Sequence, residues 1–456
     1  MERTQVKLFP DIVLLAAFAA AVLLWALGTG SLCSWDEGLY GEVSREILLT
    51  GNWIDLSWAG QAWSDKPPLY MWVTAFFGSI FGINEFSVRL FSALCGIGTV
   101  LATYGLGVRL YSRRAGICSA LFLLSTWAFI RSARLGMLDS PLTFFIVLAF
   151  LAFKLGEERP FCFFFTPVAF SLAFLTKGMG AMLIPMILGL YMVFSRDFSA
   201  LKRPALWAGI LAGLLIAGWW HAAAIAAYGE AFIRDYFVKH LVTRTTSAVE
   251  GHTGDLLTYF GVIPNKGRPW AGIGLGLLPL ALFMVFYRKE KQHILPIVWA
   301  VTVFVLFSLV KTKLHWYVVP IYPALALFCG WGLCALIKKY SVPLAFLMCL
   351  GAVVYLAADK DVFDLDFAPG TKAMALKTVE TMPVNGKLYL YGISDPGMQF
   401  YLGGKGANIH DEAGLDKAFA VRGNLLMTGR DSLPRLQGHK FSVLSEEGDF
   451  LLVVSG

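Results

Sequence analysis

Two adjacent carboxylates stand where the first long apolar run of the chain ends. Asp36 and Glu37 lie in WDEGLYGEVSRE, residues 35–46. A charged group at a membrane boundary is costly and is a candidate for function, and a carboxylate can accept the proton of an attacking hydroxyl or amine. Asp36 could equally cap a helix that Gly51 ends. The residues alone favour neither interpretation over the other.

A lysine beside a helix start forms the second candidate site. In SDKPPLY, residues 64–70, Asp65 and Lys66 precede two prolines. Proline suits the first turn of a helix, so the motif could simply begin one. The free N–H groups of that turn, together with the Lys66 ammonium, would also suit a phosphate.

Further charges fall between apolar runs that have almost no loop. RSARLGMLDSP, residues 131–141, holds Arg134 and Asp139, and FLTKGMGA holds Lys177. Arg134 and Asp139 could pair as an interfacial anchor. Lys177 could extend its ammonium toward water, which for an isolated lysine is the commoner arrangement. Taken as a group, these residues are candidates for a charged cavity.

Two later segments add cations and histidines. The segment 228–260 has aromatic residues at helical spacing, which predicts an amphipathic helix on the membrane surface, and it carries His240, Arg244 and His252. His252, with Asp65 or Glu37, could hold a divalent metal. The segment 309–323 places Lys311, Lys313 and Tyr317 at a helix start.

The composition identifies the elements that must position these residues. Of 456 residues, 57% are hydrophobic and 15% are charged, and the mean hydropathy is +0.64. Such a chain is a polytopic membrane protein. The net charge of +7 lies in short loops, which favours membrane orientation over nucleic-acid binding. The seven cysteines show no disulfide or metal spacing.

The apolar runs predict about eleven transmembrane helices. Alternate loops are basic, which places those loops in the cytoplasm and the candidate residues on the opposite face. The run 67–82 would break this alternation if it crossed, so we expect a re-entrant or interfacial helix there. The predicted spans are 11–32, 86–108, 115–133, 140–155, 160–176, 178–195, 204–224, 269–287, 293–310, 317–337 and 342–358.

The chain after residue 358 has a different character. KLYLYG, MQFYLG, NLLMTG, KFSVL and DFLLVV read as short strands, and GTKAMALKTVETM has helical character. We therefore predict a membrane domain over residues 1–358, with outer loops at 33–85 and 225–268. A small soluble α/β domain follows over 359–456, on the outer (periplasmic) side of the membrane.

The motifs together resemble a known family. WDEGLYGEVSREILLTGNW, SDKPPLYMW, FGINEFSVRLFSAL, ARLGMLDSP, FLTKG and KTKLHWYVVPIYPALAL occur in this order over residues 10–340. The pattern is similar to GT-C integral-membrane glycosyltransferases related to dolichyl-phosphate-mannose protein mannosyltransferases and to the bacterial aminoarabinose (lipid A) transferase. The resemblance implies the GT-C fold and transfer of a sugar, with inversion, from a polyprenyl-phosphate donor to lipid A, a protein or another glycolipid.

The resemblance also implies roles for individual residues. Asp36 would be the general base, with Glu37 and Asp139 as further catalytic carboxylates. Arg134, Lys177, Tyr317 and His240 would line the cavity. The aminoarabinose branch has an acidic residue before Lys-Pro-Pro that binds a metal with a loop histidine; here these would be Asp65 and His252. The donor phosphate would be held by Lys66, Arg244 and Lys313.

No nucleotide or redox cofactor is expected, because the glycosyl-phosphate bond supplies the energy. We expect a monomer in the cytoplasmic (inner) membrane whose partners are the lipid bilayer, the donor and an acceptor that the sequence does not identify. The alternative function is a transporter or flippase for lipid-linked sugars. Transporters often contain inverted repeats, and the sequence shows none.

Overall fold

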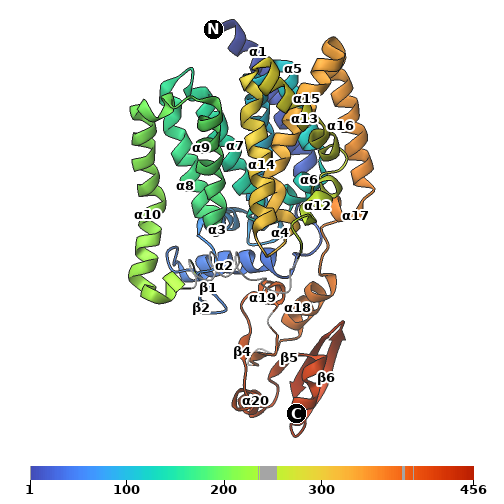
Figure 1. Cartoon of the computed structure of the whole chain (residues 1–456). Coiled ribbons are helices and arrows are strands. Elements are labelled where there is room, and N and C mark those ends of the chain that lie inside the picture. Colours follow the sequence, from blue (N-terminus) through green and yellow to red (C-terminus); the bar gives the residue numbers. More distant parts are fainter. Residues whose placement is uncertain (1, 235, 237–253, 383–385, 394) are drawn as a thin grey trace. The chain divides into compact units, whose positions relative to one another are not determined.

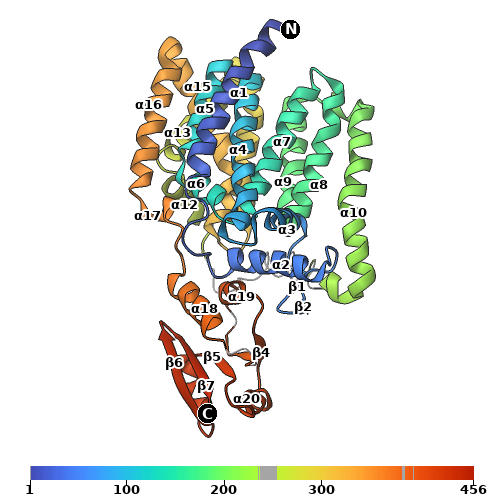
Figure 2. The ribbon, with the colours of Figure 1, turned by 180° about the vertical axis from the view of Figure 1, so that it is seen from behind.

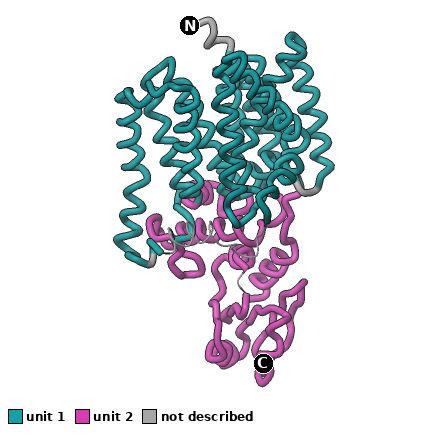
Figure 3. The backbone as a smooth tube through the Cα atoms, viewed as in Figure 1, with its two compact units in different colours: residues 1–27, 64–70, 89–363 teal, residues 28–63, 71–88, 364–456 magenta. Residues whose placement is uncertain are grey.

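The computed structural model describes the chain except residues 1, 235, 237–253, 383–385 and 394 (Figure 1). The predicted site residues His240, Arg244 and His252 lie outside the described residues. The described chain forms two compact units (Figure 3). The helical unit comprises residues 1–27, 64–70 and 89–363, and the mixed unit comprises residues 28–63, 71–88 and 364–456.

These units differ from the predicted division at residue 359. Residues 28–63 and 71–88, which we assigned to outer loops of the membrane domain, pack in one unit with the chain from residue 364. Glycine makes this packing possible. A Cβ atom at Gly38 would lie 2.8 Å from the Cα of Gly397, so the backbones of two helices of the mixed unit approach closely there.

The helical unit consists of long apolar helices that pack side by side (Figures 1 and 2). In this unit α5 packs on α15, α7 on α8, and α8 on α10. Trp127, Phe150 and Trp299 are among its fully buried side chains. The helices are α1 (Glu2–Leu23), α4 (Glu85–Leu110), α5 (Arg113–Leu124), α6 (Trp127–Arg134), α7 (Asp139–Gly156), α8 (Phe165–Lys177), α9 (Leu183–Ser195), α10 (Pro204–Phe232), α12 (Thr258–Lys266), α13 (Ala271–Arg288), α14 (Ile294–Leu309), α15 (Tyr322–Ile337), α16 (Ser341–Ala357) and α17 (Lys360–Phe363).

Within the described chain, seven helical segments are long and apolar enough to cross a membrane. The pair α5 and α6 would make an eighth and is bent by 68°. Two of the seven, Pro160–Ser195 and His315–Ala357, each hold two of the helices named above, so the predicted count of about eleven spans stays a prediction. The run 67–82 forms α3 (Leu69–Phe81), whose 13 residues extend about 20 Å, short of a hydrocarbon core of about 30 Å.

The mixed unit combines helices with a five-stranded sheet of order β4-β3-β5-β7-β6. β3 is parallel to β4 and β5, and the β5–β7 and β6–β7 pairs are antiparallel. The predicted α/β character of the tail is confirmed. Its elements are α2 (Asp36–Thr50), β1 (Ser57–Trp58), β2 (Gln61–Ala62), α18 (Pro369–Thr381), β3 (Leu388–Tyr391), α19 (Pro396–Leu402), β4 (Ala407–Ile409), α20 (Glu412–Phe419), β5 (Leu425–Gly429), β6 (Phe441–Glu447) and β7 (Phe450–Ser455).

The strand prediction for MQFYLG was wrong, because this stretch lies in helix α19. The Asp395 carboxylate caps the helix by accepting hydrogen bonds from the backbone N–H groups of Gly397 (2.8 Å) and Met398 (3.2 Å). Pro396 occupies the first turn, and Gly403 ends the helix with a φ of 64°. These start and stop signals outweigh the β-forming side chains between them.

Helix α2 ends as predicted and begins differently. Gly51 forms the C-cap with a φ of 70°. At the other end, Trp35 is the N-cap residue, and Asp36 is the first helical residue rather than the cap. The α2 helix packs on α19 within the mixed unit, which buries much of its charged sequence.

Candidate active site

An ion pair joins two of the predicted site residues in the helical unit. The Lys177 ammonium, at the end of α8, lies 2.5 Å from a carboxylate oxygen of Asp139, at the start of α7. The side chains are 19% and 3% exposed, so Lys177 does not simply extend into water. Each charge also suits its helix end, because a helix N-terminus favours an anion and a C-terminus a cation. Lys177 further lies 5.7 Å from the ring centre of Tyr317, which brings a third predicted residue to the pair.

Serine hydroxyls hold the turn that carries Asp139. Ser92 in α4 donates a hydrogen bond to the carbonyl of Met137 (2.8 Å), and its own carbonyl accepts one from Ser140 (2.8 Å). The hydroxyl of Tyr70 lies 3.2 Å from that of Ser92. The turn before α7 is therefore fixed by α4 and by the residues that follow SDKPP.

A small cavity of about 40 Å³ adjoins the ion pair. Its lining includes Arg131, Asp139, His315 and Trp316. The motifs at 131–141 and 309–323, remote in sequence, thus meet here, and Lys177 adds a third motif. A volume of this size matches about one water molecule and is too small for a sugar.

Three cations surround Trp127 at the edge of this cavity. The charged groups of Lys266, Arg268 and Arg131 lie 4.5, 4.9 and 5.5 Å from its ring. Arg268 also pairs with Asp359, which accepts the Trp127 indole N–H at 3.2 Å. With Lys177, the described residues place four cations here beside the two carboxylates of Asp139 and Asp359. The surplus positive charge suits an anionic ligand.

Sequence reasoning missed Lys266, Arg268 and His315 as site residues. Lys266 and Arg268 stand in NKGRPW, a basic stretch at the end of the predicted outer loop, and His315 directly follows KTKL. The signal that could have identified them as site residues was their position in the sequence, next to segments that already held candidate residues. The contact with Trp127 could not have been inferred from spacing, because it joins residues about 140 apart.

Arg134 does not pair with Asp139. Its guanidinium is fully buried and donates to the carbonyls of Val22 (3.1 Å), Leu23 (3.4 Å) and Trp25 (2.7 Å). These carbonyls lie at or just after the end of α1, where backbone carbonyls commonly lack an intrahelical partner. Arg134 therefore stabilises a helix terminus in the structure, and its predicted place in the cavity lining stays a prediction.

Lys313 has a comparable local role. Its ammonium donates to the carbonyls of Phe307 (2.9 Å), Ser308 (2.7 Å) and Val310, at the end of α14. An ammonium has three protons, so all three are engaged. Burial lowers the pKa of Lys313. A donor phosphate would have to displace these carbonyls, so Lys313 is less suited to phosphate binding than the cations around Trp127.

The backbone places the SDKPP motif beside Lys177. A Cβ at Gly178, which has a φ of +50°, would lie 3.9 Å from the ring of Pro67 and 2.9 Å from the hydroxyl of Tyr236. The half-buried residues Asp65 and Lys66 directly precede Pro67. The Tyr236 hydroxyl also lies 3.3 Å from Nε2 of His221, at the described start of the segment that carries the other loop candidates.

Asp36 and Glu37, the adjacent carboxylates of the mixed unit, differ in burial and in hydrogen-bond partner. Glu37 is fully buried and accepts the backbone N–H of Cys33 at 2.9 Å, so it holds the turn before α2. Asp36 is half-buried and accepts the hydroxyl of Tyr40 at 3.2 Å. Exposure therefore favours Asp36 over Glu37 as the group that could reach a substrate.

A metal site remains a prediction. Among the described residues, no group of three or more His, Cys, Asp or Glu side chains is arranged to hold a metal ion. The proposed pair includes His252, which the structure does not describe.

Comparison with known proteins finds relatives among glycosyltransferases. Residues 65–221 match the family model of dolichyl-phosphate-mannose-protein mannosyltransferase. An undecaprenyl phosphate-alpha-4-amino-4-deoxy-L-arabinose arabinosyl transferase of Pseudomonas fluorescens is 28% identical over 371 residues, which are 77% of this chain and 64% of that protein. The chain thus spans less than two thirds of that relative's length.

Solved structures match over nearly the whole chain. The crystal structure of ArnT from Cupriavidus metallidurans in the apo state superposes with a TM-score of 0.84 at 20% identity and covers 98% of both chains. The same protein bound to undecaprenyl phosphate gives a TM-score of 0.79 at 21% identity and covers 98% of this chain and 99% of that chain. At this identity the likeness shows a shared fold.

Proposed function

Because this chain has the GT-C fold and is related to the dolichyl-phosphate-mannose-protein mannosyltransferases and the aminoarabinose transferases, we propose that it is a glycosyltransferase that uses a polyprenyl-phosphate-linked sugar. The acceptor is lipid A, a protein or another glycolipid on the outer face of the cytoplasmic membrane. One observation carries the proposal: in the described part of the helical unit, four cations and two carboxylates gather where three sequence motifs meet.

This cluster suits the phosphate of a lipid-linked donor. A lipid phosphate needs cations at the membrane boundary beside apolar helices that can hold its chain. Lys177, Lys266, Arg268 and Arg131 supply the charge. Asp139 acts as a positioning residue, because its carboxylate holds Lys177 in place. Lys66 and the undescribed Arg244 are proposed to add to the same phosphate binding.

The chemical step needs a leaving group and a base. As the acceptor oxygen or nitrogen attacks the anomeric carbon, the bond from that carbon to the phosphate oxygen breaks and polyprenyl phosphate leaves. The cations offset the negative charge that grows on the phosphate. Asp36 accepts the proton that the acceptor loses. Attack on the face opposite the phosphate inverts the anomeric configuration.

A transfer assay tests this proposal. Membranes containing the wild type or Asp36→Asn receive radiolabelled sugars on polyprenyl phosphate, with native membrane extract as the source of acceptors. General-base catalysis contributes about 10²–10⁴-fold, so Asp36→Asn should lower the rate by at least about 100-fold. Asp449→Asn, in the exposed turn between β6 and β7, is the matched control and should keep full activity.

The outcomes separate the parts of the proposal. Label transferred by wild type and by Asp449→Asn, but not by Asp36→Asn, supports both the activity and the base. Equal transfer by Asp36→Asn contradicts the role of Asp36. Movement of the donor across the bilayer without transfer would instead favour the transporter.

A further inference from the structure

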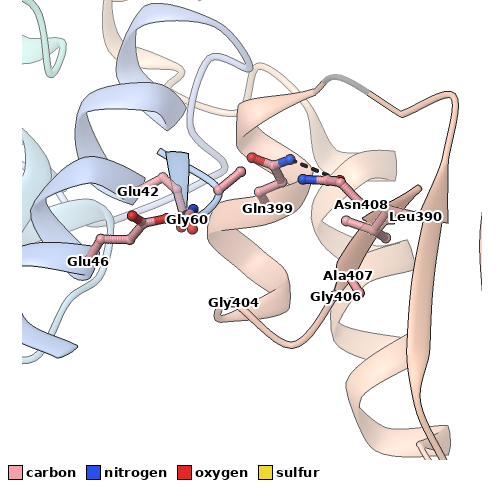
Figure 4. A pocket seen from close by; sticks show the side chains of 10 residues that line it. Glu42, Glu46, Gly60, Leu390, Gln399, Gly404, Gly406, Ala407 and Asn408 are labelled. Atoms are coloured by element: carbon pink, nitrogen blue, oxygen red, sulfur yellow. Dashed lines mark hydrogen bonds between the residues drawn. The ribbon is translucent and has the colours of Figure 1, made fainter. Parts of the chain in front are cut away.

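A second cavity, of about 290 Å³, lies wholly within the mixed unit (Figure 4). Side chains and backbone of α2, the β1–β2 turn, α19 and β4 line it. Its volume is close to the lower end of small-molecule sites, about 300 Å³. The lining includes Glu42, Glu46, Gly60, Leu390, Gln399 and Asn408.

The two carboxylates of this cavity are held in place by neighbouring groups. Glu42 accepts a hydrogen bond from Nε of Arg45 at 2.9 Å, and Glu46 accepts the Ser57 hydroxyl and the Gly60 N–H, the latter at 3.2 Å. Glu42 and Glu46 are one helical turn apart, so they share a face of α2. Each carboxylate oxygen has two lone pairs, so both groups keep capacity for further donors. Two carboxylates against one guanidinium leave the cavity wall negative.

Gln399 supplies the observation that points to a ligand. Its side chain is 6% exposed, and its amide nitrogen donates to the Asn408 side-chain oxygen at 3.4 Å (Figure 4). The amide oxygen, Oε1, is buried and has no hydrogen-bond partner among the residues that the structure describes. A buried acceptor left unpaired costs about 1–3 kcal/mol, so nearly all such atoms have partners. A bound molecule that presents a donor to Oε1 would remove this cost.

The chemistry of the wall selects the ligand. The acceptors of Glu42, Glu46, Gln399 and Asn408 require a molecule rich in hydrogen-bond donors. The negative wall disfavours a phosphate or carboxylate, and the polar lining disfavours an acyl chain. A hydroxyl-rich ring, with or without an amino group, meets these demands, and the volume admits a single ring.

We propose that this cavity binds one sugar residue of the acceptor glycan; its assignment to the acceptor rests on the proposed function. Glu42 and Glu46 lie six and ten residues after Asp36 on α2, which is roughly 9 and 15 Å along the helix axis. The ring in the cavity is therefore not the ring that receives the transferred sugar. The acceptor must extend from the reacting group to a second recognition point along α2.

Binding of free sugars tests the cavity directly. Full-length protein in lipid nanodiscs is titrated with methyl β-D-glucoside, D-glucosamine and D-glucose 6-phosphate, and saturation-transfer NMR reports binding. Ala407→Trp fills the cavity from exposed strand β4, and Gln399→Leu removes the unpaired acceptor. Ala413→Trp, on the exposed face of α20, is the matched control. Thermal unfolding of each variant checks that it is folded.

We expect methyl β-D-glucoside, which is uncharged, and D-glucosamine, which is cationic, to bind. D-glucose 6-phosphate should bind at least fivefold more weakly. Gln399→Leu should weaken binding about fivefold, the loss expected for one neutral hydrogen bond. Ala407→Trp should abolish binding, and Ala413→Trp should leave it unchanged. Absence of binding by the wild type, equal binding by folded Ala407→Trp, or preference for glucose 6-phosphate would overturn the proposal.

A second measurement separates this inference from the proposed function. Hydrolysis of the lipid-linked donor by water reports the donor site without an acceptor. Gln399→Leu should raise the acceptor KM while leaving donor hydrolysis unchanged. Sugar binding by a wild type that neither hydrolyses nor transfers any donor would contradict the proposed function and keep the sugar site. Donor transfer with no effect of Gln399→Leu on the acceptor KM would contradict the assignment to the acceptor.

Discussion

The Asp139–Lys177 pair allows a quantitative prediction. Replacing Lys177 by Met removes the cation and leaves Asp139, which is 3% exposed, without that partner. Breaking a buried ion pair costs about 3–5 kcal/mol because the remaining charge stays desolvated. Lys177 is 19% exposed, so water can partly replace it and we expect the lower end, about 3 kcal/mol. Asp139→Asn should cost less, because an amide oxygen can still accept from Lys177.

The assay is a double-mutant cycle on purified protein. Lys177→Met, Asp139→Asn and the double variant are compared by urea-induced unfolding, followed by tryptophan fluorescence at fixed detergent. If the pair is coupled, the double variant should be more stable than the sum of the two single losses predicts, by at least about 1 kcal/mol. Lys311→Met changes an exposed lysine between α14 and α15 and should shift stability by less than about 0.5 kcal/mol.

Two results would refute this reasoning. Strict additivity of the single losses would mean that the ion pair contributes no coupling. A loss no larger for Lys177→Met than for Lys311→Met would mean that Asp139 is adequately solvated without its partner.

Three further predictions follow from the helix ends and the charges. Burial raises the pKa of the Glu42 carboxyl above its ordinary value near 4.5, so the folded mixed unit holds this proton more tightly than the unfolded chain. This contribution to the free energy of unfolding is fully present below pH 4.5 and is lost as the pH rises through the pKa of folded Glu42. Glu42→Gln should therefore flatten the decline in stability with pH, measured by unfolding at a series of pH values. An unchanged slope would contradict this prediction. Lys313→Met should lower the free energy of unfolding by about 1 kcal/mol but change the KM for the donor less than twofold. Lys266→Met should raise the KM for the donor several-fold. The opposite ranking of the two variants in donor titrations would show that Lys313 binds the phosphate. Alkaline phosphatase fused after Gly456 should be active and a green fluorescent protein fused there dark, since the tail is proposed to lie outside; the reverse result would invert the topology.

The sequence predicted best what depends on local patterns. Apolar runs marked the long helices, and Gly51 marked the end of α2 because few other residues adopt its φ of 70° without strain. The length of α3 agrees with a segment too short to cross. The strand prediction for MQFYLG was wrong because the Asp-Pro start and the glycine stop that flank this stretch favour a helix more strongly than its β-forming side chains favour a strand.

Partners across the fold were beyond local patterns. Arg134 is only five residues from Asp139 in sequence, yet it binds carbonyls at the end of α1. Lys177, 38 residues from Asp139, makes the ion pair instead. Helix packing, rather than spacing, decides which charges meet. Likewise Asp36 and Glu37 are adjacent and chemically alike, yet Glu37 is buried against the turn at Cys33 and Asp36 is half-buried.

The position of Arg134 has a consequence for how the chain is made. The carbonyls at the end of α1 receive their hydrogen bonds from a side chain 112 residues later. At about 5–20 residues per second, Arg134 leaves the ribosome roughly 6–22 s after those carbonyls. Unsatisfied carbonyls in hydrocarbon cost several kcal/mol each, so during this interval the end of α1 must remain near water or in a protein-lined site. The first helix of this protein therefore reaches its final setting only after α6 has been synthesised.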